Sequence, residues 1–165
     1  MKAFKILIAI LFITTGVANA QFTKAELQVS GLTCSMCSKA TEKSLRTLDF
    51  IGDVKADLNR NIFLITFKKD VPVSLDLISK KVQGSGFFVN NLKLYFNFNN
   101  VKVANNLFSY GGDSYYLLNN STTPLDGSVP LTVVDKGFAP ASVYKKYNQA
   151  ADNKSTPGRT YHVTI

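Results

Sequence analysis

The residues best suited to chemistry are two cysteines, Cys34 and Cys37, separated by Ser35 and Met36. Two thiolates on so short a loop form a compact chelate, and soft sulfur ligands favour thiophilic ions over hard cations. Cu(I) and Hg(II) accept two sulfurs nearly in line, whereas Zn(II) prefers four ligands. The chain contains no other cysteine. The pair therefore predicts a site for Cu(I), with Hg(II) or Zn(II) as alternatives, and Met36 is expected to point outward as a spacer.

The same spacing also occurs in proteins that exchange thiols and disulfides. A structural disulfide between Cys34 and Cys37 would stabilise the fold little, because loop-closure stabilisation grows with loop length. A thiol-disulfide redox protein therefore stays an alternative function, although redox enzymes of the thioredoxin type usually carry an aromatic residue before the motif, and this chain has no tryptophan. A second alternative is an interaction protein that binds a partner through its C-terminal part.

The cysteines lie where a predicted strand ends and a predicted helix begins. Residues 25–30 alternate apolar and polar side chains, which is typical of a half-buried strand. Residues 35–48 are good helix formers, with Ser35 as the expected cap. The 3.6-residue period places a stripe on the inner face of that helix: Cys37, Ala40, Thr41, Ser44 and Leu48. Because the N-terminus of a helix favours negative charge, thiolates are expected to be stable there.

The following elements complete a small α+β domain. Residues 54–58 and 63–67 alternate as strands around the polar turn 59–61, and Ser74 precedes a second amphipathic helix that ends before Gly84. Another strand begins at Phe87. The order over residues 24 to about 90 is βαββαβ, the pattern of ferredoxin-like folds.

The motif Gly31-Leu32-Thr33-Cys34-Ser35-Met36-Cys37 resembles that of the heavy-metal-associated domain family, Gly-Met-Thr-Cys-x-x-Cys. This family includes copper chaperones, mercury carriers and the N-terminal modules of copper-pumping ATPases. The resemblance implies a ferredoxin-like fold, Cys34 and Cys37 as metal ligands, and a neighbouring shell of Leu32, Thr33 and Phe87, with the Phe87 ring covering the site. It also implies transfer of the ion by ligand exchange with a metal donor or acceptor protein. Two departures are Leu32, where the family has Met, and Thr41, where it has Val or Ile.

Residues 1–20 have the three parts of a secretory signal peptide. Lys2 and Lys5 precede an uncharged apolar run, and Ala18-Asn19-Ala20 supplies small residues for cleavage after Ala20. The run is shorter than the roughly 20 residues that cross a bilayer. We therefore expect an exported protein, periplasmic or secreted, with no membrane span after removal of the signal.

The expected domain organisation is residues 1–20 as the signal peptide, 21–90 as the heavy-metal-associated domain and 91–165 as a small β-rich domain of unknown role. The last part is rich in asparagine and aromatic residues. Alternating runs at 92–98, 101–103 and 115–118, an apolar run at 131–134 and a final run at 161–165 predict strands, and 139–150 predict one helix. A partly open barrel of the oligonucleotide/oligosaccharide-binding type fits this inventory, as do other small sandwiches.

The remaining features argue against other classes of function. The net charge is +8, but the basic residues are spread thinly along the chain, so no nucleic-acid partner is predicted. The only histidine, His162, lies on the final predicted strand, where a structural role is expected. Without a Ser-His-Asp set or a phosphate-binding glycine loop, no enzymatic activity is expected. The sequence does not indicate an oligomeric state.

Overall fold

The structure is a computed structural model that describes residues 20–31, 35–99, 101–119, 125–148 and 158–165. Its elements follow in the order β1 (Gln21–Ser30), α2 (Ser35–Leu45), β2 (Ile51–Asp57), β3 (Ile62–Phe67), α3 (Leu75–Gly84), β4 (Phe88–Asn97), β5 (Leu107–Tyr110), β6 (Asp113–Leu117), β7 (Ser128–Val133), α4 (Ala141–Asn148) and β8 (Thr160–Thr164). Within these described ranges, no helix is both long and apolar enough to cross a membrane. The predicted signal peptide lies outside the described residues, apart from Ala20.

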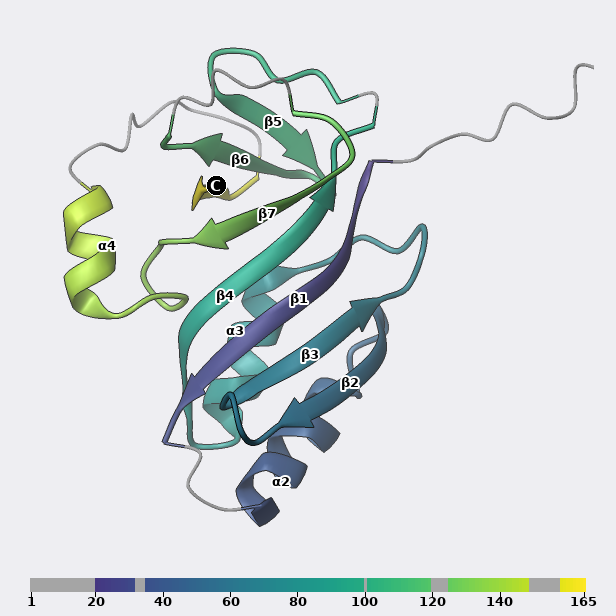
Figure 1. The fold of residues 1–165 in the computed structure, drawn as a ribbon, viewed down its shortest axis with the longest axis vertical. Coiled ribbons are helices and arrows are strands. Elements are labelled where there is room, and N and C mark those ends of the chain that lie inside the picture. Colours follow the sequence, from purple (N-terminus) through teal and green to yellow (C-terminus); the bar gives the residue numbers. More distant parts are fainter. Residues whose placement is uncertain (1–19, 32–34, 100, 120–124, 149–157) are drawn as a thin grey trace, which may run out of the picture.

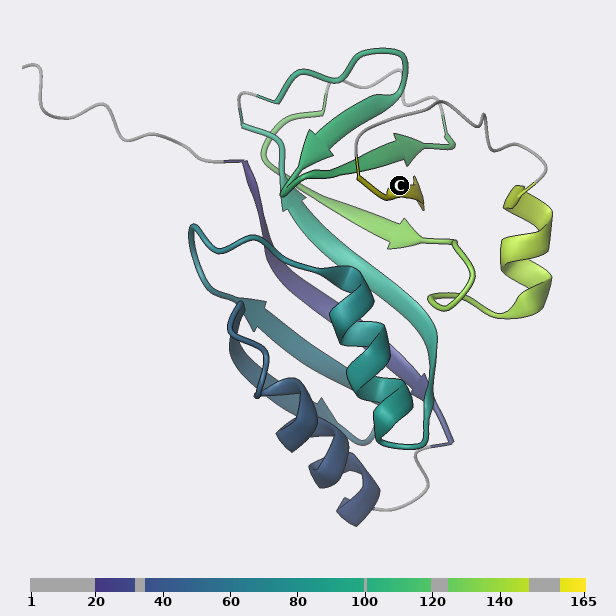
Figure 2. The same ribbon diagram turned by 180° about the vertical axis from the view of Figure 1, so that it is seen from behind.

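The first half of the chain has the predicted βαββαβ arrangement. Its strands lie in the order β2-β3-β1-β4, and each neighbouring pair is antiparallel. The helices α2 and α3 both cover one face of this sheet (Figures 1 and 2). This order, with both helices on one side, is the ferredoxin-like topology, and it confirms the α+β class for this part of the chain.

The inner face of α2 differs from the predicted stripe. The buried side chains on the helix are Ser38, Thr41 and Leu45, whereas Ala40 is exposed and Cys37 is half-buried. The stripe was right at Thr41 and Leu48, which are buried, but it missed the buried Ser38 and Leu45. The helix also ends at Leu45, three residues earlier than predicted, and the buried Leu48 lies in the following turn.

The strand β4 connects the two halves of the molecule. It pairs with β1 on one side and with β7 on the other, so the predicted domain boundary after residue 90 falls inside a ten-residue strand. Beyond β7 the sheet continues with β8, β6 and β5, giving one eight-stranded sheet with β2 and β5 at its edges. The predicted barrel is not confirmed, because the described strands form an open sheet.

Two further predictions in this half fail for local reasons. Residues 101–103, predicted as a strand, lie outside any strand, and Leu107–Tyr110 forms one that was not predicted. Between them, Asn105 and Asn106 both have positive φ, of 51° and 61°, and Ala104 and Leu107 exchange two backbone hydrogen bonds across them. Two consecutive left-handed residues are the signature of a type I′ turn. Because asparagine tolerates this conformation, this pair places the reversal before Leu107.

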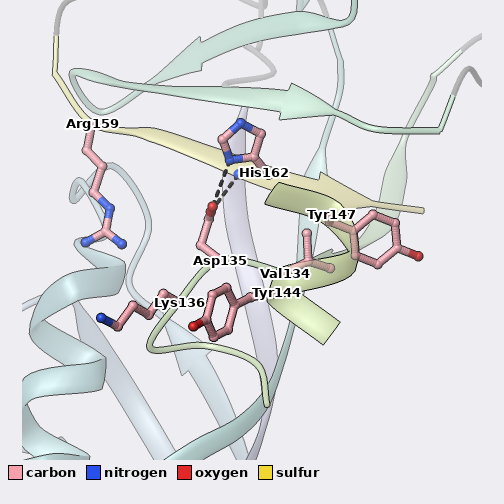
Figure 3. A pocket seen from close by; sticks show the side chains of 7 residues that line it. All are labelled: Val134, Asp135, Lys136, Tyr144, Tyr147, Arg159 and His162. Carbon is pink, nitrogen blue, oxygen red and sulfur yellow. Dashed lines mark hydrogen bonds and ion pairs between the residues drawn. The ribbon is translucent and has the colours of Figure 1, made fainter. Parts of the chain in front are cut away.

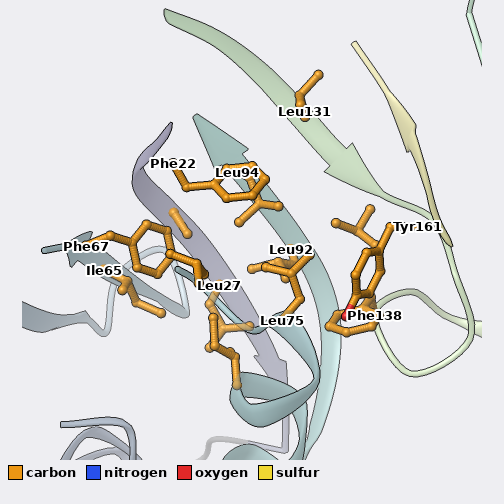
Figure 4. Packing of buried hydrophobic residues seen from close by; sticks show 14 of the residues in the cluster. Phe22, Leu27, Ile65, Phe67, Leu75, Leu92, Leu94, Leu131, Phe138 and Tyr161 are labelled. Atoms are coloured by element: carbon orange, nitrogen blue, oxygen red, sulfur yellow. The ribbon is translucent and has the colours of Figure 1, made fainter. Parts of the chain in front are cut away.

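One hydrophobic core runs through both halves. Leu27, Ile65 and Leu75 belong to the same buried cluster as Leu131 and Tyr161 (Figure 4). On the C-terminal side the cluster is largely aromatic, with edge-on and stacked rings at centroid separations of 4.8 to 5.4 Å. The sharing of one core explains how a strand can cross the predicted boundary, since the buried side chains of β4 belong to this core along the strand, from Val89 to Phe96.

Candidate metal centre

The candidate centre lies at the N-terminus of α2. This helix begins at Ser35, Met36 is 80% exposed, and the Cys37 side chain is half-buried one residue further on. The exposure of Met36 agrees with its predicted role as a spacer. Cys34, with Leu32 and Thr33, lies outside the described residues, so the predicted pairing of the two sulfurs stays a prediction.

The backbone of Cys37 is tied to the buried face of α2. The Thr41 hydroxyl donates a hydrogen bond of 3.1 Å to the Cys37 carbonyl, and Thr41 is fully buried. A threonine four residues after an acceptor commonly bonds back in this way within a helix. The sequence therefore contained a signal for this contact that our prediction did not use. Thr41, the buried polar residue that departs from the family pattern, thus has its hydroxyl hydrogen-bonded to the backbone of Cys37, a predicted metal ligand.

Phe87 is positioned by the way α3 ends. Gly86 has a φ of 86°, its N–H donates to the Gln83 carbonyl, and the Phe87 N–H donates to the Val82 carbonyl. These two bonds and the left-handed residue make a Schellman motif, which turns the chain sharply off the helix. Because the chain reverses at Gly86, Phe87 lies immediately before the first residue of β4.

The Phe87 ring reaches the strand that leads into the cysteine loop. A Cβ on Gly31 would lie 3.5 Å from Phe87 Cδ1, which is van der Waals contact. The adjacent residues are joined as well, because Ser30 pairs with Phe88 in the β1–β4 ladder and its hydroxyl donates to the Phe88 carbonyl at 3.2 Å. Phe87 therefore packs against Gly31, which immediately precedes residues 32–34, and its covering of the site stays a prediction.

The charges on α2 are arranged favourably for an anion at its N-terminus. The first turn holds no acidic residue, and the helix dipole places partial positive charge there. The acidic partners lie at the other end, where Arg46 donates hydrogen bonds to Glu42 and Asp53. These bonds raise the pKa of Arg46, and the hydrogen bond from Arg46 lowers the pKa of Asp53. The ion pairs therefore stabilise the C-terminal end of α2 without adding negative charge beside Cys37.

His162 lies on β8, away from the cysteine loop. Its Nδ1 lies 2.7 Å from Asp135 Oδ1, and its backbone N–H donates to Asp135 Oδ2 at 2.6 Å (Figure 3). No local pattern could have shown this pair, since the two residues are 27 positions apart. Among the residues that the structure describes, no group of three or more histidine, cysteine or acidic side chains could hold a metal ion.

Comparison with known proteins finds a domain family that matches part of the chain. The family model for the heavy-metal-associated domain matches residues 26–88, which contain Cys34, Cys37 and Phe87. A comparison with curated proteins finds no match.

Several solved structures are similar to part of the chain. One is the yeast copper transporter domain Ccc2a, solved in apo and Cu(I)-loaded states, with 28% identity over 39% of this chain and 88% of that chain and a TM-score of 0.36. A second is a putative copper-ion-binding protein from Bacillus anthracis, with 26% identity over 44% and 97% of the chains and a TM-score of 0.37. A third is the N-terminal domain of a potential copper-translocating P-type ATPase from Bacillus subtilis, with 19% identity over 41% and 82% of the chains and a TM-score of 0.37. On the family-model match, residues 26–88 of this chain are a heavy-metal-associated domain.

Proposed function

We propose that the protein binds one soft metal ion, first of all Cu(I), through the sulfurs of Cys34 and Cys37. The observation that carries the proposal is the family match over residues 26–88, which encloses both cysteines at the start of α2. Thiolate ligands select Cu(I) and similar ions over hard cations. Hg(II) is the alternative that the same two sulfurs would hold, and Zn(II) would require further ligands.

The position of the cysteines suits transfer of the ion. Cys37 is only half-buried and Met36 is largely exposed, so an incoming thiolate can approach the loop. In the exchange, the incoming sulfur forms a bond to the ion before one of the two original sulfur bonds breaks. The metal keeps its oxidation state, and no covalent bond of a substrate is made or broken. The partner would be a protein that donates or accepts the ion, and the role would be delivery or sequestration, not catalysis.

The test is native mass spectrometry of the reduced protein with Cu(I), Hg(II) and Zn(II), each added alone. We expect about one Cu(I) per chain, loss of the bound ion in the Cys34→Ser/Cys37→Ser double variant, and full binding in Met36→Leu as the matched control. Retention of Cu(I) by the double variant would refute the cysteines as ligands. Protein that is permanently bridged between the two cysteines when freshly isolated would favour the redox alternative.

We further infer that the protein is exported and that residues 1–20 are removed. The strand β1 begins at Gln21, the residue that would follow cleavage after Ala20, so removal of the signal would leave the sheet whole. The measurement is N-terminal sequencing of the protein recovered from the periplasmic or secreted fraction. A mature terminus at Gln21 is expected, and an intact Met1 in cytoplasmic protein would overturn the inference.

A further inference from the structure

A cavity of about 240 Å³ lies in the C-terminal half, between the end of β7, the helix α4 and the strand β8 (Figure 3). None of the described residues that line it is a cysteine, so the proposed metal transfer does not account for it. Ligand pockets for drug-sized molecules are commonly about 300 to 1,000 Å³. The cavity therefore fits a ligand somewhat smaller than these.

Asp135 is the one carboxylate among the described residues of the wall, and it is already hydrogen-bonded. Both oxygens of Asp135 bond to His162, one to the ring nitrogen and one to the backbone N–H, and the two side chains are only 19% and 16% exposed. A carboxylate that accepts two hydrogen bonds is stabilised where it lies. Asp135 and His162 thus form a fixed part of the wall.

The two longer cations in the wall are not equivalent. The guanidinium of Arg159 is paired with Asp76 through Nη1, and it also lies over the Tyr161 ring at 4.7 Å from the centroid. Its remaining N–H donors point away from that pair in the fixed fork of the group. Lys136 has no ion pair with any residue that the structure describes. The wall therefore offers the ammonium of Lys136, which has no ion-pair partner among the described residues, and the additional N–H donors of Arg159.

The opposite wall is aromatic and comes from one helix. Tyr144 and Tyr147 are three residues apart on α4, which places them on neighbouring positions of the same face. Both are half-buried, and Val134 adds an aliphatic surface at the end of β7. These rings and the valine can contact a flat or compact apolar body, while the charged wall contacts its polar end.

We propose that this cavity binds a small monocarboxylate with an aromatic or apolar body. The carboxylate would bind Lys136 and the unused donors of Arg159, and the body would pack against Tyr144 and Tyr147. A single carboxylate can bind Lys136, whereas a second carboxylate on the ligand would face Asp135 without a further cation among the described lining residues. The cavity size limits the body to about one ring.

The probe is benzoate. The uncharged control is benzamide, which has nearly the same shape. Each is titrated into isotope-labelled full protein and followed by two-dimensional NMR, with and without the Cys34→Ser/Cys37→Ser substitutions. We expect benzoate to shift the backbone signals of residues 134–136 and 159–162 and to bind at least about fivefold more tightly than benzamide. The double cysteine variant should give the same result, since the cavity and the cysteine loop lie on different elements.

Charge variants localise the contact. Lys136→Met should weaken benzoate binding about fivefold, because a partly exposed ion pair contributes modestly. Lys145→Met, which removes an exposed charge from α4 outside the cavity wall, should leave the affinity unchanged. Equal affinities for benzoate and benzamide, equal effects of the two lysine variants, or shifts confined to residues outside the cavity would each overturn the proposal. A failure of metal binding with benzoate binding intact would refute only the proposed function.

Discussion

The sharpest test of how the structure positions Phe87 is a pair of alanine substitutions at the end of α3. Gly84 is the last residue of the helix, and Gly86 follows it with a φ of 86°. Both are exposed, and a Cβ added at either position would meet no atom within 4 Å. The substitutions Gly84→Ala and Gly86→Ala therefore differ in backbone conformation and not in packing.

The expected effects have opposite signs. At Gly86 the left-handed conformation costs a residue with a Cβ about 1–2 kcal/mol, offset by roughly 0.5 kcal/mol from the stiffer unfolded chain, so a net loss of about 1 kcal/mol is expected. At Gly84 the helical conformation suits alanine, which stabilises a helix position by up to about 1 kcal/mol relative to glycine. The two variants should therefore differ in the free energy of unfolding by about 2 kcal/mol.

The assay is urea denaturation under reducing conditions, followed by far-ultraviolet circular dichroism. The midpoint should fall for Gly86→Ala and rise for Gly84→Ala with an unchanged dependence on urea. Gly86→Asn should lie between Gly86→Ala and the parent protein, because asparagine tolerates the left-handed region. If Gly86→Ala were as stable as the parent, or if both alanine variants moved together, the Schellman turn would not be what ends α3 and places Phe87.

Three further predictions concern buried and charged groups. Thr41→Val should change the free energy of unfolding by less than about 1 kcal/mol, because it removes the hydroxyl that bonds to Cys37 without leaving a cavity. Thr41→Ala should cost about 1–2 kcal/mol more, because it does leave one. Thermal denaturation of both variants measures the difference, and equal costs would contradict the prediction. The Tyr115 hydroxyl is buried without a hydrogen-bond partner among the described residues, so Tyr115→Phe should stabilise the protein by up to about 1 kcal/mol, and a loss of stability in the same assay would refute the assignment. The pKa of Asp53 is lowered, chiefly by the hydrogen bond from Arg46, so its contribution is present above its ordinary pKa near 4 and is lost as pH falls through the lowered value. Denaturation of Asp53→Asn and the parent at several pH values should show a difference that disappears in acid, and a difference that persisted below that range would contradict the assignment.

Much of the first half could be predicted because its signals are local. Each of these signals depends only on a few neighbouring residues: the alternation in residues 25–30 and 63–67, the helix periodicity after Ser74, and the glycines around residue 86. The order βαββαβ then leaves few ways to cover one face of a small antiparallel sheet. The face of α2 was predicted only in part, because spacings of three and four residues fit neighbouring stripes of one helix: Thr41 and Leu48 are buried as predicted, whereas the buried Leu45 was missed.

The second half shows what depends on long-range pairing. The alternating residues of β4 indicate a strand, but they do not tell which partner lies beside it, and β7 joins it from more than thirty positions away. The pair formed by Asp135 and His162 depends in turn on where β8 enters the sheet. Contacts of this kind carry no sequence period, because the residues meet only after the sheet has assembled.

The sequence by itself predicted the βαββαβ domain and the helix that begins near Ser35, because residue type, spacing and turn conformation are properties of short segments. Metal binding by Cys34 and Cys37 stays a prediction. Only the tertiary structure decided that the sheet continues through β4 into the last third of the chain, and that Phe87 packs against Gly31. It alone brought Lys136, Arg159 and two tyrosines around one cavity. The physical reason is that burial and strand pairing join residues whose separation along the chain leaves no local trace.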